Sequence, residues 1–249
     1  MNASAASSYW AQVDVMPRAL FPALFCGNNV TSEESREFTQ LATTISFGTG
    51  KTIFAEGEPA DSAFGVSQGV VRLYKLLPDG RRQVVAFALP GDFLGMPLAT
   101  RHSCYADAIG AVSLCRFSRT ELSSVIQSSP DIERRLIEFI ARELDRARDQ
   151  LLLLGNASAE ERVAIFLVNW RNRLERVGPV SQPLPLPMPR QDIADFLGLK
   201  LETVSRTLAK LEQKNVIRLV PKGVFLNGLE ETPLVTGRTS TEAKRGCPI

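Results

Sequence analysis

The chain of 249 residues has little of the chemistry on which most enzymes depend. It holds a single histidine, His102, and no two carboxylates sit in a setting typical of acid-base catalysis. We expect His102 to be an exposed loop residue, because a lone histidine lacks the partners that a catalytic or metal site needs. The sequence therefore predicts no catalytic residues, no metal site and no cofactor, and a protein that is not an enzyme.

Cysteine is scarce and scattered. The four residues Cys26, Cys104, Cys115 and Cys247 form no CxxC pair, which argues against both a disulfide framework and a zinc site. Cys115, in the segment VSLCRF, is expected to pack in a strand as a small hydrophobic residue. Cys26 and Cys247 lie near the termini and are the candidate redox thiols.

Long apolar runs are missing as well. No stretch approaches the ~20 residues of a membrane-spanning helix, and the chain does not begin with a basic segment followed by an apolar core. We therefore expect a cytoplasmic protein that has no membrane partner. The formal net charge is only +2, but residues 190–222 carry seven Lys or Arg against four Asp or Glu, a local excess of +3. A local positive field of this kind is typical of a DNA-docking module.

A phosphate-binding motif is only partly present. Residues 49–52, TGKT, contain the ending of a P-loop, but the motif requires a glycine five residues before Gly50, where Ile45 stands. Lys51 and Thr52 also lead into β-branched and aromatic residues instead of opening a helix. This departure argues against nucleotide hydrolysis.

Two short helices separated by a glycine form the most informative pattern in the chain, in residues 190–212 (RQDIADFLGLKLETVSRTLAKLE). The first helix has an apolar face made by Ile193, Ala194 and Leu197, and Gly198 permits a left-handed turn. The segment VIRLVPKGVFL that follows alternates loosely and breaks at Pro-Lys-Gly, as a two-stranded wing does. Together these features predict a winged helix-turn-helix.

The second of these helices has two faces with different chemistry. One face is an apolar stripe that must be buried, formed by Val204, Leu208 and Leu211. The opposite face carries Glu202, Ser205 and Arg206. A carboxylate accepts from cytosine N4, and a guanidinium donates two bonds to guanine O6 and N7. The outward face is therefore predicted to read DNA bases, although an amphipathic helix pair with a solvated polar face would show a similar pattern.

Short apolar runs separated by turns fill the region from about residue 43 to 122. They lie at residues 52–55, 64–66, 70–74 and 83–87, with a turn expected between the second and third runs at Gln68-Gly69. Such spacing predicts a β-sandwich or roll.

These two parts of the chain resemble the CRP/FNR family of bacterial transcription regulators, over roughly residues 30–229. The segments DIADFLGL and LETVSR are most similar to its FNR and FixK branches, and GKTIFAEGEPAD, QGVVRLY and LPGDFLG resemble its cyclic-nucleotide-binding β-roll. The resemblance implies an α+β protein with an amino-terminal cyclic-nucleotide-binding-like β-roll, a long dimerisation helix and a carboxy-terminal winged helix-turn-helix. It also implies double-stranded palindromic DNA with TTGA-type inverted half-sites, and RNA polymerase, as partners.

The same resemblance assigns DNA-binding residues. Base-contacting positions are matched by Glu202, Ser205 and Arg206, and Leu201 is also expected to bind DNA. Positions that touch the DNA backbone are matched by Gln191, Lys200 and Thr203. Pro189 precedes the first helix where many relatives have Ser or Thr, which removes a side-chain cap.

The resemblance also allows the effector pocket to be checked. Relatives that respond to cyclic AMP have a glutamate where Met96 stands and an arginine-serine pair where His102-Ser103 is the nearest match. Met96 cannot bond a ribose hydroxyl, and a histidine is a weaker, pH-dependent partner for a phosphate. An FNR-type iron-sulfur cluster needs four cysteines, but the amino-terminal region offers only Cys26. A FixK-like regulator that needs no cyclic nucleotide fits best; the alternative is an effector-gated regulator of the same fold that senses a small ligand, haem or redox state.

Residues 130–154 form a long helical pattern. Its apolar residues are spaced by 4, 4, 3, 4 and 3: Leu136, Ile140, Leu144, Ala147, Leu151 and Leu154. This average lies near the 3.5 of a coiled coil, and a helix of about 25 residues spans roughly 37 Å, too long for one small domain to cover. We therefore expect a parallel homodimer along this helix; the alternative is a helix packed on its own domain.

The predicted organisation has five parts. They are a flexible lead-in at residues 1–29, a β-roll at 30–128, a dimerisation helix at 129–156, a winged helix-turn-helix at 157–229 and a disordered tail at 230–249. The turn at residues 155–158 is a candidate hinge. The five prolines between residues 179 and 189 predict an extended connector or edge strand.

Overall fold

The computed structural model describes residues 40–95, 99–180 and 182–235. Within the described residues the chain forms two compact units that divide between Arg148 and Asp149.

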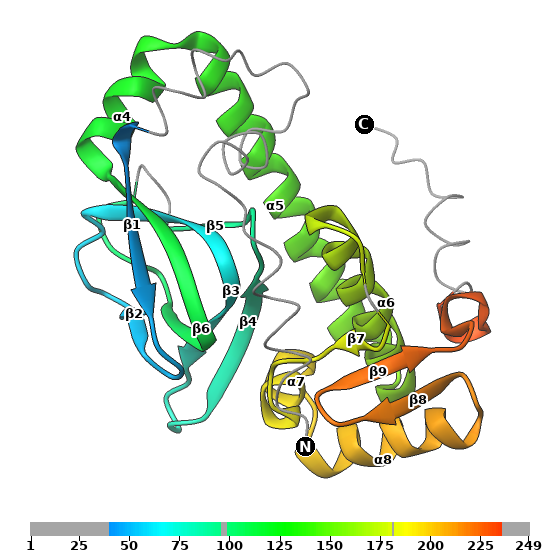
Figure 1. Cartoon of the computed structure of the whole chain (residues 1–249). Coiled ribbons are helices and arrows are strands. Elements are labelled where there is room, and N and C mark those ends of the chain that lie inside the picture. Colours follow the sequence, from blue (N-terminus) through cyan, green and yellow to red (C-terminus); the bar gives the residue numbers. More distant parts are fainter. Residues whose placement is uncertain (1–39, 96–98, 181, 236–249) are drawn as a thin grey trace. The chain divides into compact units, whose positions relative to one another are not determined.

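The first unit contains a six-stranded antiparallel sheet (Figure 1). Its strands are β1 (Ala42–Phe47), β2 (Thr52–Phe54), β3 (Ser62–Leu76), β4 (Arg82–Ala88), β5 (Phe93–Leu94) and β6 (Tyr105–Ser118). The strand order is β1-β6-β3-β4, with β2 paired to β6 and β5 paired to β3. Apolar side chains from the two central strands, among them Val66, Val71 and Leu114, are fully buried, so β3 and β6 supply the centre of the core.

The turn predicted at Gln68-Gly69 is wrong, because β3 continues through both residues as one strand. The pairing of β3 with β6 shifts register on either side of Gln68, which marks a β-bulge. Gly69 has a φ of +86°, and a Cβ atom placed on it would lie 2.4 Å from the carbonyl oxygen of Ala111. Only glycine fits this bend, so the residue that reads as a turn signal instead lets a long strand curve.

Two helices follow the sheet: α4 (Arg119–Ser128) and α5 (Pro130–Asn156). The first turns of α5 bury Ile132 and Leu136 in a cluster with Phe117 of β6 and Leu122 of α4. Leu136 is 4% exposed in this single chain, so its side chain is already covered by its own unit. Leu136 is therefore a core residue of the first unit, which corrects its predicted place in a dimer seam. The part of α5 after Arg148 belongs to the second unit.

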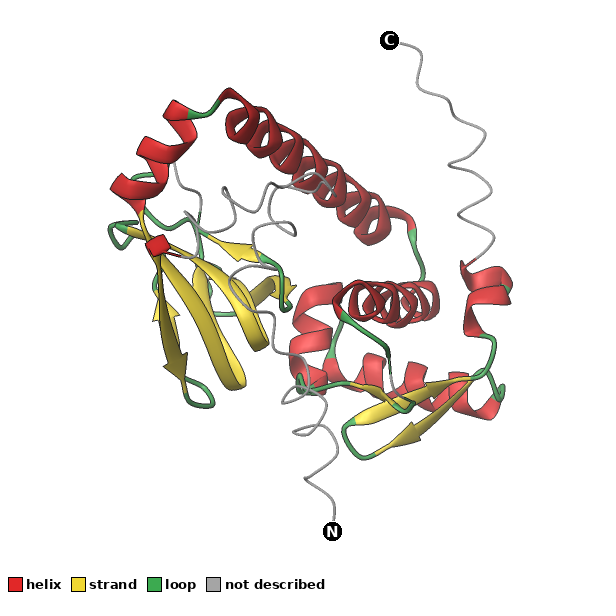
Figure 2. Cartoon of the chain, turned by 45° about the horizontal axis from the view of Figure 1, so that its top comes forward, coloured by secondary structure: helices red, strands yellow, loops and turns green. Residues whose placement is uncertain are grey.

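The second unit combines helices with a small antiparallel sheet (Figure 2). Its elements are α6 (Ala159–Val177), β7 (Leu184–Pro185), α7 (Arg190–Leu197), α8 (Leu201–Gln213), β8 (Ile217–Val220), β9 (Gly223–Leu226) and the 3-10 helix η1 (Leu229–Glu231). The strand order β7-β9-β8 confirms the predicted wing and places the proline-rich segment at a sheet edge, where a missing N–H is tolerated.

Side-chain hydrogen bonds cap the start of α6 and anchor the helix to the small sheet. The Ser158 hydroxyl accepts from the Glu161 N–H at 3.3 Å and the Glu161 carboxylate accepts from the Ser158 N–H at 2.7 Å, which completes a capping box. Further along the helix, the buried indole of Trp170 donates to the Pro185 carbonyl oxygen at 2.8 Å. This bond joins α6 to the edge strand of the sheet.

The carboxy-terminal end of the described chain is joined to α6. Residues 229–231 form η1, and the Glu230 carboxylate lies 2.6 Å from a guanidinium nitrogen of Arg171. Leu229 is fully buried. The first residues of the predicted disordered tail are therefore part of the second unit, while residues 236–249 and the predicted lead-in lie outside the described residues.

Candidate nucleic-acid interface

The turn between α7 and α8 depends on one glycine. Gly198 has φ 62° and ψ 36°, the left-handed conformation that ends α7, and its N–H donates to the carbonyl oxygen of Ala194. The Leu199 N–H donates to the same oxygen at 3.0 Å. At the other end of α7, Pro189 stands at the cap position and makes no side-chain capping bond, as its side chain predicts. The backbone thus turns sharply between the two helices.

The two faces of α8 are separated as the periodicity predicts. Val204, Leu208 and Leu211 are buried against the rest of the unit. On the other side Glu202 and Arg206 are exposed, and Ser205 is half-buried. The Nε atom of Arg206 donates to the Glu202 carbonyl oxygen at 3.4 Å. A carboxylate, a hydroxyl and a guanidinium therefore lie together on the open side of the helix.

Residues at the start of α8 extend this surface. Lys200 is exposed and caps the helix with its backbone, and Leu201 is 38% exposed although its side chain is apolar. Thr203 is half-buried. On α7 the Gln191 side chain is exposed and its amide donates to the Asp195 carboxylate at 2.6 Å. The residues predicted to bind DNA, other than Gln191 on α7, thus lie in the amino-terminal half of α8 or at its cap.

The lysines at the other end of α8 face a carboxylate of their own unit. The Lys210 ammonium lies 2.6 Å from the Glu160 carboxylate, and Lys214 pairs with the same group. Hydrogen bonds from these two lysines lower the pKa of Glu160 below its usual value. Within residues 200–222, the basic residues that do not pair with Glu160 are Lys200 and Arg206 at the beginning of α8 and Arg218 and Lys222 on the wing.

The wing adds two cationic residues that the sequence pattern does not single out. Arg218 lies directly across the sheet from Phe225, and its guanidinium carbon is 4.1 Å from the centre of that ring. Lys222 is exposed at the tip of the wing with a φ of +58°. Recognising the Arg218 contact requires the register of β8 and β9, which the sequence alone does not specify.

The histidine expected on an exposed loop lies inside the first unit. His102 is 8% exposed, and its ring stacks on Phe54 with a centroid distance of 3.8 Å. The His102 N–H donates to the Glu58 carbonyl oxygen at 3.0 Å, and the His102 carbonyl oxygen accepts from the Gly57 N–H at 2.9 Å. This backbone pairing turns the imidazole inward, so the expectation of exposure is wrong. Burial lowers the pKa of His102 and favours the neutral ring.

The cysteines have separate environments. Cys115 is buried in β6, which confirms that it packs as a small hydrophobic residue. Cys104 is half-buried, and burial raises the pKa of its thiol. Cys26, Cys247 and the pocket position Met96 lie outside the described residues.

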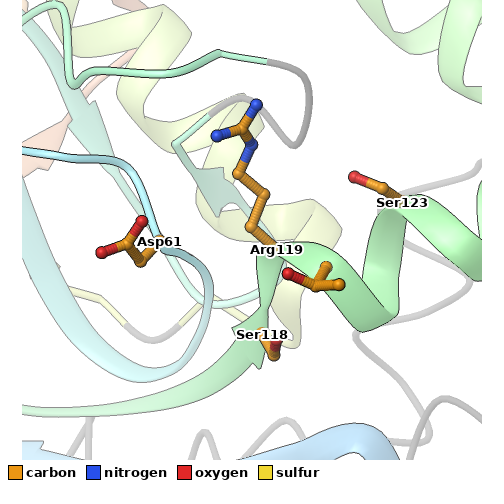
Figure 3. A pocket seen from close by; sticks show the side chains of 5 residues that line it. Asp61, Ser118, Arg119 and Ser123 are labelled. Carbon is orange, nitrogen blue, oxygen red and sulfur yellow. The ribbon is translucent and has the colours of Figure 1, made fainter.

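A polar hollow of about 410 Å³ lies where β6 joins α4 (Figure 3). Its lining includes Asp61, Ser118, Arg119, Thr120 and Ser123. Figure 3 shows the Arg119 side chain standing between Asp61 and Ser123. Among these described lining residues Asp61 is the one carboxylate, and none is a histidine or a cysteine.

The described part of the chain contains neither a metal-binding cluster nor a helix suited to a membrane. In residues 40–95, 99–180 and 182–235, no group of three or more His, Cys, Asp or Glu is arranged to hold a metal ion. None of the helices in that same part of the chain combines the length and apolar character needed to cross a membrane.

Comparison with known proteins assigns both units to families. Residues 44–129 match the cyclic nucleotide-binding domain, and residues 161–231 match the Crp-like helix-turn-helix domain. These ranges contain most of the sheet of the first unit and the α7–α8 pair with its wing.

Individual relatives cover most of the chain. The nitrogen fixation regulation protein FixK of Bradyrhizobium diazoefficiens is 50% identical over 199 residues, which span 80% of this chain and 84% of the relative. The transcriptional activatory protein AadR of Rhodopseudomonas palustris is 52% identical over 191 residues, or 77% of this chain and 80% of the relative. The solved structure of FixK2 from Bradyrhizobium japonicum matches with a TM-score of 0.72 and 39% identity, over 76% of this chain and 94% of that one.

Proposed function

We propose that this chain, which belongs to the FixK-like branch of the CRP/FNR family of transcription regulators, acts as a homodimer that reads two inverted DNA half-sites of the TTGA type. The observation that carries the proposal is the outer face of α8, where Glu202, Ser205 and Arg206 lie opposite a fully buried stripe. A helix held rigidly by one face can present the other to the major groove.

Each residue on this face has chemistry suited to a base edge. The Arg206 guanidinium can donate two hydrogen bonds to guanine O6 and N7, and the Glu202 carboxylate can accept from cytosine N4. Leu201 exposes apolar surface beside them, and such surface contacts the C5-methyl group of thymine. A guanine preceded by thymines, as in TTGA, is a sequence that this combination favours, which supports the proposal.

Backbone contacts are assigned to the residues around the reading face. Lys200 and Thr203 lie at the start of α8, and Gln191 lies in the first turn of α7. Phosphate contacts from such residues fix the orientation of the helix but carry no sequence information. We expect the Gln191 amide to exchange its bond with Asp195 for a phosphate oxygen when DNA binds.

The dimer seam on α5 is revised by the burial of Leu136. Its neighbour Ile137 is 61% exposed, while Leu144 and Leu151 are 50% and 70% exposed. The seam then consists of Ile137, Ile140, Leu144, Ala147, Leu151 and Leu154, spaced by 3, 4, 3, 4 and 3. This strict alternation is the coiled-coil repeat, and it supports a parallel pair of α5 helices.

The roll is proposed to work without a cyclic nucleotide. His102 is the nearest match to the phosphate-binding arginine of relatives that respond to cyclic AMP, and it is an imidazole stacked on Phe54 whose burial favours the neutral form. An effector shifts an equilibrium only if it binds one state of the protein more tightly than the other. A neutral ring provides little electrostatic attraction for a phosphate anion, so a cyclic nucleotide would gain little affinity from it. We accordingly propose a cytoplasmic activator that binds its operator unaided and recruits RNA polymerase, by analogy with the relative named as an activatory protein.

A binding-site selection on random double-stranded DNA tests this function. Purified protein should enrich inverted TTGA-type half-sites at a fixed spacing, in the absence of any added nucleotide, metal or haem. Enrichment of one unpaired half-site would contradict the dimer, and enrichment of no sequence until an effector is added would favour the effector-gated alternative.

A further inference from the structure

One side chain joins the end of α5 to the helix-turn-helix within the second unit. Arg162, in the first turns of α6, donates from Nη2 to the Leu154 carbonyl oxygen at 2.6 Å and from Nε to the Ala157 carbonyl oxygen at 2.9 Å. Its remaining nitrogen, Nη1, donates to the Leu197 carbonyl oxygen at 3.1 Å. All three guanidinium nitrogens are therefore bonded to backbone carbonyls.

The acceptors explain why this position carries an arginine. Leu154 lies in the last turn of α5 and Leu197 is the last residue of α7, so both are carbonyls that a helix end leaves without a helical partner. A cation is stabilised at the carboxy-terminal end of a helix and opposed near the amino-terminal end of its own. The site of Arg162 is thus favoured by two neighbouring helices and disfavoured by α6. A planar fork of donors reaches three carbonyls at once, which a lysine ammonium on a flexible stem does less well.

Neighbouring contacts tie the same two segments together. The Gln150 side chain of α5 donates to the Phe196 carbonyl oxygen of α7 at 3.4 Å. Leu153 of α5 is buried. The sequence predicts a hinge at residues 155–158. Arg162, however, forms hydrogen bonds to residues on both sides of that turn. The last turns of α5 and the helix-turn-helix are therefore cross-linked by hydrogen bonds.

We propose that Arg162 is a positioning residue for DNA recognition: it holds the end of the dimer seam and the reading helix as one body. This inference rests on the proposed dimer, in which Leu151 and Leu154 pair with their counterparts across the seam. Because the seam then sets the direction of α8 through Arg162, the two reading helices of a dimer are presented at one spacing and one rotation. Arg162 thereby contributes to the choice of half-site spacing without touching a base.

The consequence is specific to palindrome geometry. Changing the spacer between half-sites by one base pair rotates one half-site relative to the other by about a tenth of a helical turn. With a rigid link, the second α8 helix cannot follow that rotation, so the dimer should lose affinity for the altered palindrome. With a loosened link, the helix should follow the rotation and the affinity should fall less. The contact between one α8 helix and one half-site should be nearly independent of the link.

The experiment compares full-length variants on three palindromes and on a duplex that carries one half-site. The palindromes have the preferred spacer and spacers one base pair shorter and longer, and Kd is measured by fluorescence anisotropy. The variants are Arg162→Ala, Arg162→Lys and Gln150→Ala. Arg171→Ala is the matched control, because Arg171 lies on the same helix and pairs with Glu230 instead of with α5 or α7.

Wild-type protein should prefer the best spacer by about tenfold or more, as expected for half-sites held at fixed separation. Arg162→Ala and Arg162→Lys should reduce that ratio to about two- or threefold, with Gln150→Ala intermediate, while half-site affinity changes by less than about twofold. Arg171→Ala should lose thermal stability but keep the wild-type ratio. A merely structural role for Arg162 would lower stability in the same way and leave the ratio unchanged.

Two outcomes would overturn the proposal. One is a wild-type spacer ratio in dimeric, folded Arg162→Lys; the other is an equal loss on half-sites and palindromes, which would place the effect in the helix-turn-helix itself. Arg162→Lys and Gln150→Ala decide the matter if Arg162→Ala does not fold. If wild-type protein binds a palindrome no better than one half-site, the proposed dimeric function fails, a result distinct from a spacer preference that the variants retain.

Discussion

The outer face of α8 and the interior of the β-roll use their polar groups in opposite ways. On α8 the side chains of Glu202 and Arg206 are exposed, and the helix is held by its apolar stripe. In the roll the imidazole of His102 is turned inward and stacked on Phe54. The first region keeps its polar groups on an exposed surface, while the second packs one against an aromatic side chain of the same unit. This contrast supports the proposal that the chain recognises DNA without binding a cyclic nucleotide.

Disruption of the proposed dimer should reduce DNA affinity more than any other change considered. Leu144→Asp combined with Leu151→Asp would bury charges in the seam, so we expect folded monomers by sedimentation. Affinity for a palindrome should fall by a factor on the order of 100 or more, because one half-site no longer holds the second reading helix nearby. Leu152→Asp, at an equally exposed position outside the seam, is the control and should remain dimeric.

A narrower change tests base reading on α8. Arg206→Ala should cost about 1 to 3 kcal/mol per half-site and relax the preference for guanine, because a bidentate contact is lost. Lys200→Ala, at a predicted phosphate contact, should weaken specific and scrambled DNA about equally and reduce the salt dependence of binding. If Arg206→Ala left the ratio of specific to scrambled affinity unchanged in gel-shift titrations, the reading role of Arg206 would be wrong.

Alanine substitutions at two glycines, one in each unit, should reduce folding stability by different amounts. Gly69→Ala places a Cβ atom 2.4 Å from a backbone oxygen at positive φ and should destabilise the first unit by at least about 2 kcal/mol. At Gly198 the nearest atom lies 3.8 Å from the added Cβ, so alanine there should cost only the left-handed conformation, about 1 to 2 kcal/mol. Urea unfolding followed by circular dichroism measures both values, and equal losses would count against the close approach at Gly69.

The smallest predicted effect is the pH dependence that His102 confers. Burial lowers its folded pKa, so below about 6.5 the unfolded chain takes up a proton that the folded chain resists. Stability from the buried neutral ring is therefore complete above that pH and declines as the pH falls toward the lowered pKa. His102→Phe keeps an aromatic ring against Phe54 and should flatten this decline in melting temperatures measured between pH 5 and 7. An unchanged decline in the variant would assign the effect to other groups.

Local patterns predicted the α7–α8 pair well because the residues that specify it lie close together in the sequence. The spacing of Val204, Leu208 and Leu211 specifies which face of α8 is buried, and Gly198 is a turn glycine at the expected place. The same locality explains the α5 repeat, although periodicity did not distinguish Leu136 from Ile137. Both residues are apolar neighbours, and the choice between them depends on how the start of α5 packs on α4 and β6.

The features that the sequence predicted wrongly, or did not reveal, depend on residues that lie far apart in the chain. Gly69 is required in its strand because the carbonyl oxygen of Ala111 lies close to it. His102 is buried because its loop pairs with the turn near Glu58. The three bonds of Arg162 require the ends of two other helices to converge on α6. A glycine, a histidine or an arginine read in its own segment carries no signal of such partners.

Operator affinity with and without cyclic AMP tests the central claim most directly. Purified full-length protein should bind the selected palindrome in gel-shift titrations with the same Kd in the absence and the presence of millimolar nucleotide, because the roll offers the phosphate a neutral ring. Operator binding that appears only when the nucleotide is added would contradict the account.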